Sequence, residues 1–196
     1  MSRIPLELGA WVELTEAWLA PAEAAASMQT LLEQLAWEQR HIVLFGKPIL
    51  QPRLIAWAGE LPYRYSGQTL EPRPWPAAVS ALRARVSAAA QTELNHVLIN
   101  RYRHGQDSMG YHADAEPELG PDPVVASLSL GQARRFLLRR HGQKGMPPLA
   151  LSLGSGSLLV MGGTLQRHYR HAVPRDRSQD LGERISLTFR RVLRAP

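Results

Sequence analysis

Three residues of the chain could together hold a metal ion: His112, Asp114 and, much later, His171. In an extended segment, side chains two residues apart point to the same side, so His112 and Asp114 can bind one ion together. A histidine from a distant strand would complete a two-histidine, one-carboxylate facial triad, which leaves the opposite face of the metal open. Such open positions suit a non-haem iron that takes a chelating cosubstrate and O₂. The tripeptide alone is a weak signal, so the rest of the sequence must agree with it.

A second set of charged groups lies near the end of the chain. The alternation in residues 184–190 predicts a strand with an apolar face and a polar face, formed by Ile185, Leu187 and Phe189 and by Arg184, Ser186, Thr188 and Arg190. In a straight strand the two guanidiniums would lie roughly 20 Å apart, so both would have to bend inward to share a small dianion. The alternative is an edge strand with a solvated basic face, which this segment taken alone favours.

Composition limits the class of protein. With 196 residues and 44% hydrophobic content, the chain is long enough for a single domain with a core. It has no cysteine, which excludes disulfides, iron–sulfur clusters, thiolate zinc sites and cysteine nucleophiles. The first residues contain acids and no continuous apolar stretch, and no run approaches the length of a membrane span. We therefore expect a soluble cytoplasmic protein, monomeric and without a membrane partner.

The charge balance points toward polyanions. The net charge is +6 and the pI is about 10.3, and arginine, which suits bidentate phosphate contacts, supplies nearly all of the positive charge. A basic protein from an arginine-rich proteome would look the same, so charge alone leaves both interpretations open. One cluster is expected around a single hairpin, where some of its members would contact phosphate: Arg134, Arg135, Arg139, Arg140, His141 and Lys144.

The order of elements predicts an α+β fold. Apolar spacing predicts a helix from Pro21 to about Trp37 and another that begins near Trp75 and places Val79, Leu82 and Val86 on one stripe. Five strands are then expected, at 95–102, 124–130, 134–140, 157–161 and 184–193, with a hairpin turn at Gly131-Gln132. Helices followed by strands favour helices packed on one face of an antiparallel double sheet. A jelly-roll core fits, because its open mouth can hold a metal between the sheets.

Taken together, these residues resemble the AlkB family of Fe(II)- and 2-oxoglutarate-dependent dioxygenases. The resemblance covers about residues 40–193 and includes Asn100-Arg-Tyr102, His112-Ala-Asp114, His171 and the strand from Arg184 to Arg190, in the family's order and approximate spacing. It implies that the cofactors are Fe(II), 2-oxoglutarate as cosubstrate, and O₂. It also implies one domain over 1–196, with a double-stranded β-helix core at 95–193 and a nucleotide-recognition lid and finger at 40–70.

The resemblance assigns roles to individual residues. His112, Asp114 and His171 look like the iron ligands, while Asn100 and Tyr102 match positions that contact 2-oxoglutarate. Arg184 looks like the partner of the distal carboxylate of that cosubstrate, and Arg190 like the partner nearer its chelating end. The family often has asparagine where this chain has Ser186, so Ser186 is assigned no contact.

Within the family, the chain looks similar to the branch that repairs alkylated bases in duplex DNA. Leu44-Phe45-Gly46-Lys47 resembles the finger of that branch, whose apolar tip, here Phe45, fills the gap left by an extruded base; the less favoured alternative is that Phe45 is a buried strand residue. Substrate contacts are expected from Arg53, Tyr63, Tyr65 and Glu116, with the two tyrosines stacking on a flipped base. Glu116, whose alternative is a solvated loop acid, would suit a base made cationic by methylation or one with an exocyclic amine.

The resemblance implies oxidative demethylation of bases such as 1-methyladenine and 3-methylcytosine in DNA, with release of formaldehyde, succinate and CO₂. One alternative is a 2-oxoglutarate oxygenase that acts on RNA or on a protein side chain. Another is a non-catalytic nucleic-acid-binding module, and a zinc hydrolase is a weaker one. The expected partner is nucleic acid, namely alkylated DNA and possibly RNA.

Overall fold

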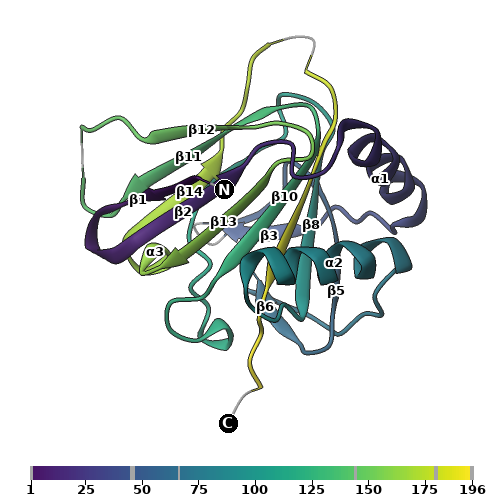
Figure 1. Cartoon of the computed structure of the whole chain (residues 1–196), viewed down its shortest axis with the longest axis horizontal. Helices are drawn as coiled ribbons and strands as arrows, with labels where there is room; N and C mark the ends of the chain where they lie inside the picture. Colours follow the sequence, from purple (N-terminus) through teal and green to yellow (C-terminus); the bar gives the residue numbers. More distant parts are fainter. Residues whose placement is uncertain (1, 45–46, 66, 144, 179–180, 195–196) are drawn as a thin grey trace.

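Two antiparallel sheets face each other, and two helices cover the outer side of the larger sheet (Figure 1). The structure, a computed structural model, describes residues 2–44, 47–65, 67–143, 145–178 and 181–194. Within these ranges, no helix is long and apolar enough to cross a membrane. The layered arrangement confirms the predicted α+β class with a jelly-roll core.

The larger sheet has seven strands in the order β1-β2-β13-β10-β15-β8-β5, which are β1 (Ser2–Pro5), β2 (Ala10–Thr15), β13 (Leu158–Gly163), β10 (Val125–Gly131), β15 (Arg184–Arg190), β8 (His96–Tyr102) and β5 (Leu54–Gly59). The smaller sheet has four, in the order β12 (Leu149–Leu153), β11 (Arg134–Arg140), β14 (Tyr169–Val173) and β9 (Met109–His112). Two separate hairpins are formed by β3 (His41–Leu44) with β4 (Lys47–Leu50) and by β6 (Tyr63–Tyr65) with β7 (Gln68–Leu70). The helices are α1 (Pro21–Gln34), α2 (Ala77–Ala90) and α3 (Leu165–His168), with short 3-10 turns at η1 (Glu7–Gly9) and η2 (Pro117–Leu119).

The helices α1 and α2 pack their apolar stripes on the outer face of the seven-stranded sheet. Leu31 of α1 and the predicted stripe of α2 are buried in one cluster with the apolar residues of β10, β15 and β8. Proline at the first position of α1 suits a helix start, because its missing N–H would have no partner there. This helix ends at Gln34 rather than near Trp37, since Leu35 already has an extended backbone (φ −87°, ψ 136°).

The strand β15 lies in the middle of the seven-stranded sheet, between β10 and β8, and all of its residues are buried. The alternative of a solvated edge strand is therefore wrong. Ile185, Leu187 and Phe189 pack under the helices, as the alternation predicted. The opposite, polar face points into the space between the two sheets, where it lines a cavity.

The predicted hairpin at Gly131-Gln132 is wrong. The strand β10 belongs to the larger sheet and β11 to the smaller one, so the turn carries the chain from one sheet to the other. Gly131 has φ +83°, and a Cβ there would lie 2.4 Å from the carbonyl oxygen of Glu183. This crowding, rather than a tight hairpin, explains why glycine stands at the crossing.

A third apolar cluster fixes the β6–β7 hairpin, which lies in the segment expected to form the lid, to the sheets. Tyr63, Tyr65 and Leu70 are buried against Ile55 and Leu98 on the face of β5 and β8 that points away from the helices. The lid therefore lies beside the same inter-sheet space that the polar face of β15 lines. The seven-stranded sheet also takes in β1, β2 and β5, which precede residue 95 in the sequence.

Candidate metal centre and cosubstrate pocket

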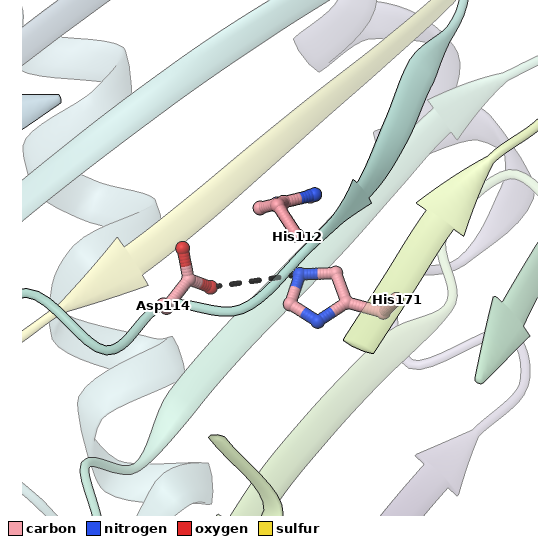
Figure 2. Close-up of side chains that lie close together, drawn as sticks. All are labelled: His112, Asp114 and His171. Carbon is pink, nitrogen blue, oxygen red and sulfur yellow. Dashed lines mark ion pairs between the residues drawn. The ribbon is translucent and has the colours of Figure 1, made fainter. Parts of the chain in front are cut away.

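The fold brings the three predicted metal ligands together (Figure 2). His112 ends β9 and is paired across the sheet with His171 of β14, while Asp114 follows β9 in the chain. One ligand atom from each residue lies within 4.8 Å of the other two, and His171 Nε2 is 3.7 Å from Asp114 Oδ2. Two imidazoles and a carboxylate at this spacing can coordinate one divalent ion from one side.

The protonation states of these groups suit a metal. Burial lowers the pKa of His171 to about 3 and also lowers that of His112, so both rings are neutral at pH 7. Burial is the largest single effect on Asp114 and raises its pKa, but Arg190 and the two histidines together outweigh it, and the pKa is about 2. Nδ1 of His112 lies 2.9 Å from the carbonyl oxygen of Gly110, which assigns the proton to Nδ1 and leaves Nε2 to bind a metal.

Neighbouring side chains hold Asp114 in place. Its backbone N–H donates to Oε1 of the buried Gln166 at 2.9 Å, and Nη2 of Arg190 donates to its Oδ1 at 2.7 Å. Its Oδ2 has no hydrogen-bond partner among the described residues and faces the histidines. Gln166 belongs to the one-turn helix α3, just before β14. The sequence offered no signal for its role, because this glutamine is not part of a recognisable motif.

A cavity between the sheets continues from the metal ligands along the polar face of β15. It is lined by fourteen residues, including all four polar residues of that strand and, from other strands, Asn100, Tyr102, Ser127, Phe136 and Met161. Both predicted cosubstrate residues of β8 thus lie in it. Ser186, for which no contact was expected, also lines it, and its hydroxyl lies 3.3 Å from that of Ser127.

Arg184 lines this cavity with part of its guanidinium group unpaired. Its side chain is 1% exposed, and Nη2 donates to Ser129 Oγ at 2.9 Å. Nε and Nη1 have no hydrogen-bond partner in the part of the chain that the structure describes. Burial lowers the pKa of Arg184, because a buried cation without a counter-ion is costly. A dicarboxylate would supply both the missing charge and the missing acceptors, so the residues present fit 2-oxoglutarate.

The lid and the loop after β9 place the expected base-binding residues near the metal ligands. The guanidinium of Arg190 lies 5.6 Å from the ring centroid of Tyr63. Burial, and then the charge of Asp114, raises the pKa of Glu116 above its ordinary value. Its carboxyl group and the Tyr63 hydroxyl are close enough to affect each other's pKa, but neither Glu116 Oε2 nor the Tyr63 hydroxyl makes a well-formed hydrogen bond among the described residues. Glu116 is therefore half-buried beside Tyr63 and Asp114 rather than a fully solvated loop acid.

Two arginines lie elsewhere than the sequence suggested. Arg53, expected to contact substrate, is 4% exposed and donates to Asn100, Ser108 and Tyr65. Arg134, expected in the phosphate-facing cluster, is 3% exposed and donates to backbone carbonyls of the loops beside β8 and β14. Only some members of that cluster were expected to contact phosphate, because alternation divides the arginines of one strand between its two faces.

The finger is described only in part. The strands β3 and β4 pair as an antiparallel hairpin, with His41 opposite Leu50. The tip residue Phe45, expected to fill the gap of an extruded base, lies outside the described residues.

Comparisons with known proteins agree with this geometry. A sequence profile described as the 2OG-Fe(II) oxygenase superfamily matches residues 12–190. Alpha-ketoglutarate-dependent dioxygenase alkB homolog 3 of Mus musculus is 36% identical over 209 residues, which cover all of this chain and 68% of that protein. This chain belongs to the AlkB family of 2OG-Fe(II) oxygenases.

The predicted family, its enzyme class and its cofactors Fe(II), 2-oxoglutarate and O₂ are thereby confirmed for this oxygenase. DNA oxidative demethylase ALKBH2 of Homo sapiens is 37% identical over 183 residues, which cover 88% of this chain and 70% of that protein. The Homo sapiens alkB homolog 3 is matched over 63% of its length, so the chain spans about two thirds of these relatives. The solved structure of OsALKBH1 covers 97% of this chain with a TM-score of 0.68 at 17% identity, which supports the fold alone.

Proposed function

We propose that this oxygenase oxidatively demethylates N-alkylated bases in DNA, such as 1-methyladenine and 3-methylcytosine. The observation that carries the proposal is the position of Glu116, a half-buried glutamate whose Oε2 has no hydrogen-bond partner among the described residues and whose carboxyl group lies near Asp114 and Tyr63. A methylated base that carries a positive charge or an exocyclic amine supplies what that oxygen lacks. The relatives named alkB homolog 3 and DNA oxidative demethylase ALKBH2 support the same reaction class.

The overall reaction balances as follows. One oxygen atom of O₂ enters succinate as 2-oxoglutarate loses CO₂, and the other enters the N-methyl group to give a hydroxymethyl group. The C–N bond of that group then breaks, which releases formaldehyde and returns the base nitrogen to its unmodified state. Fe(II), held by His112, Asp114 and His171, supplies the redox chemistry that activates O₂.

The residues of the chain supply binding and orientation. Arg184 binds the distal carboxylate of the cosubstrate through its unpaired guanidinium N–H groups, and Asn100 and Tyr102 line the path to the metal. Arg190 contributes at the chelating end while it keeps Asp114 ionised. Because the cavity is buried between two sheets, water is excluded from the reacting groups.

Base recognition falls to the lid and to Glu116. Tyr63 and Tyr65 are 0% and 4% exposed in the ligand-free protein, so they would shape the wall of the base site rather than offer the free ring surface for stacking that the sequence suggested. The carboxyl group of Glu116 faces the exocyclic or methylated edge of the base. A methyl group held in this way lies close to the metal ligands, and such positioning is the main contribution that a protein makes to an oxidation of this kind.

The proposal is tested by loading the protein with Fe(II) and 2-oxoglutarate without oxygen, adding oligonucleotides with single methylated bases, and admitting air. We expect demethylated base and succinate in equal amounts with DNA. Asp114→Ala should abolish both products, whereas His104→Gln, a change at an exposed histidine, should leave them unchanged. The same assay with methylated RNA and methylated peptides covers the alternatives. Turnover on RNA or peptide but not on DNA would refute the proposal.

A further inference from the structure

One buried arginine joins the cosubstrate pocket to the lid. Arg53 follows the finger hairpin in the chain and is 4% exposed. Its Nε donates to Asn100 Oδ1 at 2.8 Å, Nη1 to the carbonyl oxygen of Ser108 at 3.1 Å, and Nη2 to the hydroxyl of Tyr65 at 2.5 Å. All three nitrogens are therefore bound within the protein. Arg53 is not placed to meet a phosphate or a base.

The three partners belong to three different parts of the site. Asn100 lies on β8 and lines the cavity, and Tyr65 ends β6 in the lid. Ser108 directly precedes β9, the strand that ends at the metal ligand His112. The backbone reinforces the link, because the N–H of Ser108 donates to the carbonyl oxygen of Pro52 at 2.9 Å. One rigid guanidinium thus spans the elements that present cosubstrate, base and metal.

The contact with Asn100 has a chemical consequence. Since Oδ1 of Asn100 accepts from Arg53, the amide is oriented by this bond and its Nδ2 donors remain for other acceptors. The cavity beside Asn100 is where a carboxylate of the cosubstrate would lie. Without Arg53, the amide could rotate and turn its acceptor toward that carboxylate. Arg53 therefore determines that Asn100 presents its amide N–H donors, and not its oxygen, to the cosubstrate.

We propose that Arg53 is a positioning residue that couples cosubstrate binding to the order of the lid. A cosubstrate that fixes Asn100 also fixes Arg53, and Arg53 holds Tyr65 by its hydroxyl. By thermodynamic linkage, the factor by which the cosubstrate strengthens base binding is also the factor by which a base that orders the lid strengthens cosubstrate binding. The inference rests on the proposed role of Asn100 and goes beyond it, since it needs no particular base.

The experiment uses the full chain loaded with Mn(II), which cannot turn over. Hydrogen–deuterium exchange of the peptide that covers residues 60–70 is compared with and without 2-oxoglutarate, and the affinity for 2-oxoglutarate is measured by calorimetry. We expect 2-oxoglutarate to slow exchange in the natural protein by about fivefold or more. In Arg53→Met this slowing should vanish, and the affinity for 2-oxoglutarate should fall about tenfold, as expected for lost charge-assisted hydrogen bonds.

Two further variants make the result specific. Tyr65→Phe removes only the hydroxyl that binds Arg53, so it should lose the slowing of lid exchange and keep the natural affinity for 2-oxoglutarate. Arg101→Met is the matched control, because Arg101 is the next residue on β8, pairs with Glu183 and stacks on Trp37, away from the cavity. It should behave like the natural protein.

Slowing of lid exchange that persists in Arg53→Met or in Tyr65→Phe would overturn the proposal, as would its absence from the natural protein. If Arg53→Met fails to fold, Tyr65→Phe decides alone. Nucleic acid takes no part in these measurements, so a failed demethylation assay and a failed coupling are distinguishable.

Discussion

Asp114 is held at both its backbone and its carboxylate, and only one of the two contacts carries charge. Arg190 binds Oδ1, whereas the amide oxygen of Gln166 accepts from the backbone N–H and so fixes the direction in which the side chain leaves the chain. The carboxylate oxygen left over, Oδ2, faces His171. Residues in contact with metal ligands tune affinity nearly as strongly as the ligands do.

Replacement of Gln166 by methionine should therefore weaken metal binding. The change keeps the size of the side chain but leaves the buried N–H of Asp114 without an acceptor, which costs about 1–3 kcal/mol. We expect the affinity for Mn(II), measured by titration, to fall about 10- to 100-fold. Gln29→Met, at an exposed glutamine on α1, is the control. Equal Mn(II) affinities for Gln166→Met and the natural protein would show that Gln166 does not position Asp114.

His96 gives the molecule an acid-sensitive point away from the metal ligands. Its ring is buried 4.7 Å from that of Tyr63, and neither ring nitrogen has a partner among the described residues. Burial, aided by the charge of Arg190, lowers its pKa from 6.5 to about 3. The unfolded chain thus binds a proton that the folded chain rejects, so stability is full above pH 6.5 and is lost as the pH falls toward 3.

His96→Leu should remove this dependence. We measure urea unfolding with a chelator present. As the pH falls from 6.5, the free energy of unfolding of the variant should rise relative to that of the natural protein. The slope should approach about 1.4 kcal/mol per pH unit, the value for one proton. Parallel pH curves for the two proteins would mean that His96 does not carry the effect. The other buried histidines are common to both and cancel in the difference.

The two faces of β15 have different tasks: one packs in the apolar core and stabilises the fold, and the other lines the cavity. Leu187 is fully buried under the helices. Arg184, three residues earlier and on the opposite face of the strand, is buried as a cation without a counter-ion among the described residues. Leu187→Ala should lower stability by about 2–5 kcal/mol. Arg184→Met should instead raise the stability of the ligand-free protein by about 1–2 kcal/mol, because a costly buried charge is removed.

Thermal unfolding with and without 2-oxoglutarate and Mn(II) separates the two faces. A ligand that binds only the folded state raises Tm according to its affinity. Leu187→Ala should keep the increment that 2-oxoglutarate produces, while Arg184→Met should lose it. If Arg184→Met retained the increment, the distal carboxylate would have to bind elsewhere.

The same strand shows what the sequence could and could not predict. Its alternation predicted both faces correctly, and the apolar stripe of α2 was predicted by its spacing, because local periodicity reflects which face is buried. Which strands are neighbours depends on contacts distant in sequence, so β15 could be read as an edge and Gly131 as a hairpin turn. For the same reason the metal ligands were found by type and order, whereas Gln166 and the partners of Arg53 were not. The cytoplasmic location and the monomeric state stay predictions.

For the whole molecule, the net charge of +6 hides how the arginines are used. Each of the five tryptophans has at least one arginine guanidinium over its ring, and each of these arginines is paired with a glutamate. The most crowded case is Trp57, where Arg40 and Arg73 share the ring and both bind Glu38. These arginines contribute to packing and already have a carboxylate partner.

Other cations gather on the outer face of the smaller sheet. Arg139 and Arg170 are directly opposite each other on β11 and β14, and among the described residues neither has an ion-pair partner. The next pair in the register, Leu138 and His171, lies on the inner face with the metal ligand, so the two arginines are separated from the site by one thickness of sheet. An anionic backbone that passes the site could reach them.

Arg139→Ala with Arg170→Ala should therefore weaken oligonucleotide binding without a change in base preference. Each lost phosphate contact reduces the slope of log affinity against log salt by about 1, so the double variant should lose up to about 2. Fluorescence anisotropy from low to moderate salt measures both the affinity and the slope. Arg167→Ala is the control, since Arg167 is engaged by Asp122 and should leave the slope unchanged. A double variant with the natural slope would place the phosphate contacts on another surface, and Arg64 of the lid, exposed between Tyr63 and Tyr65, would be the next residue to change.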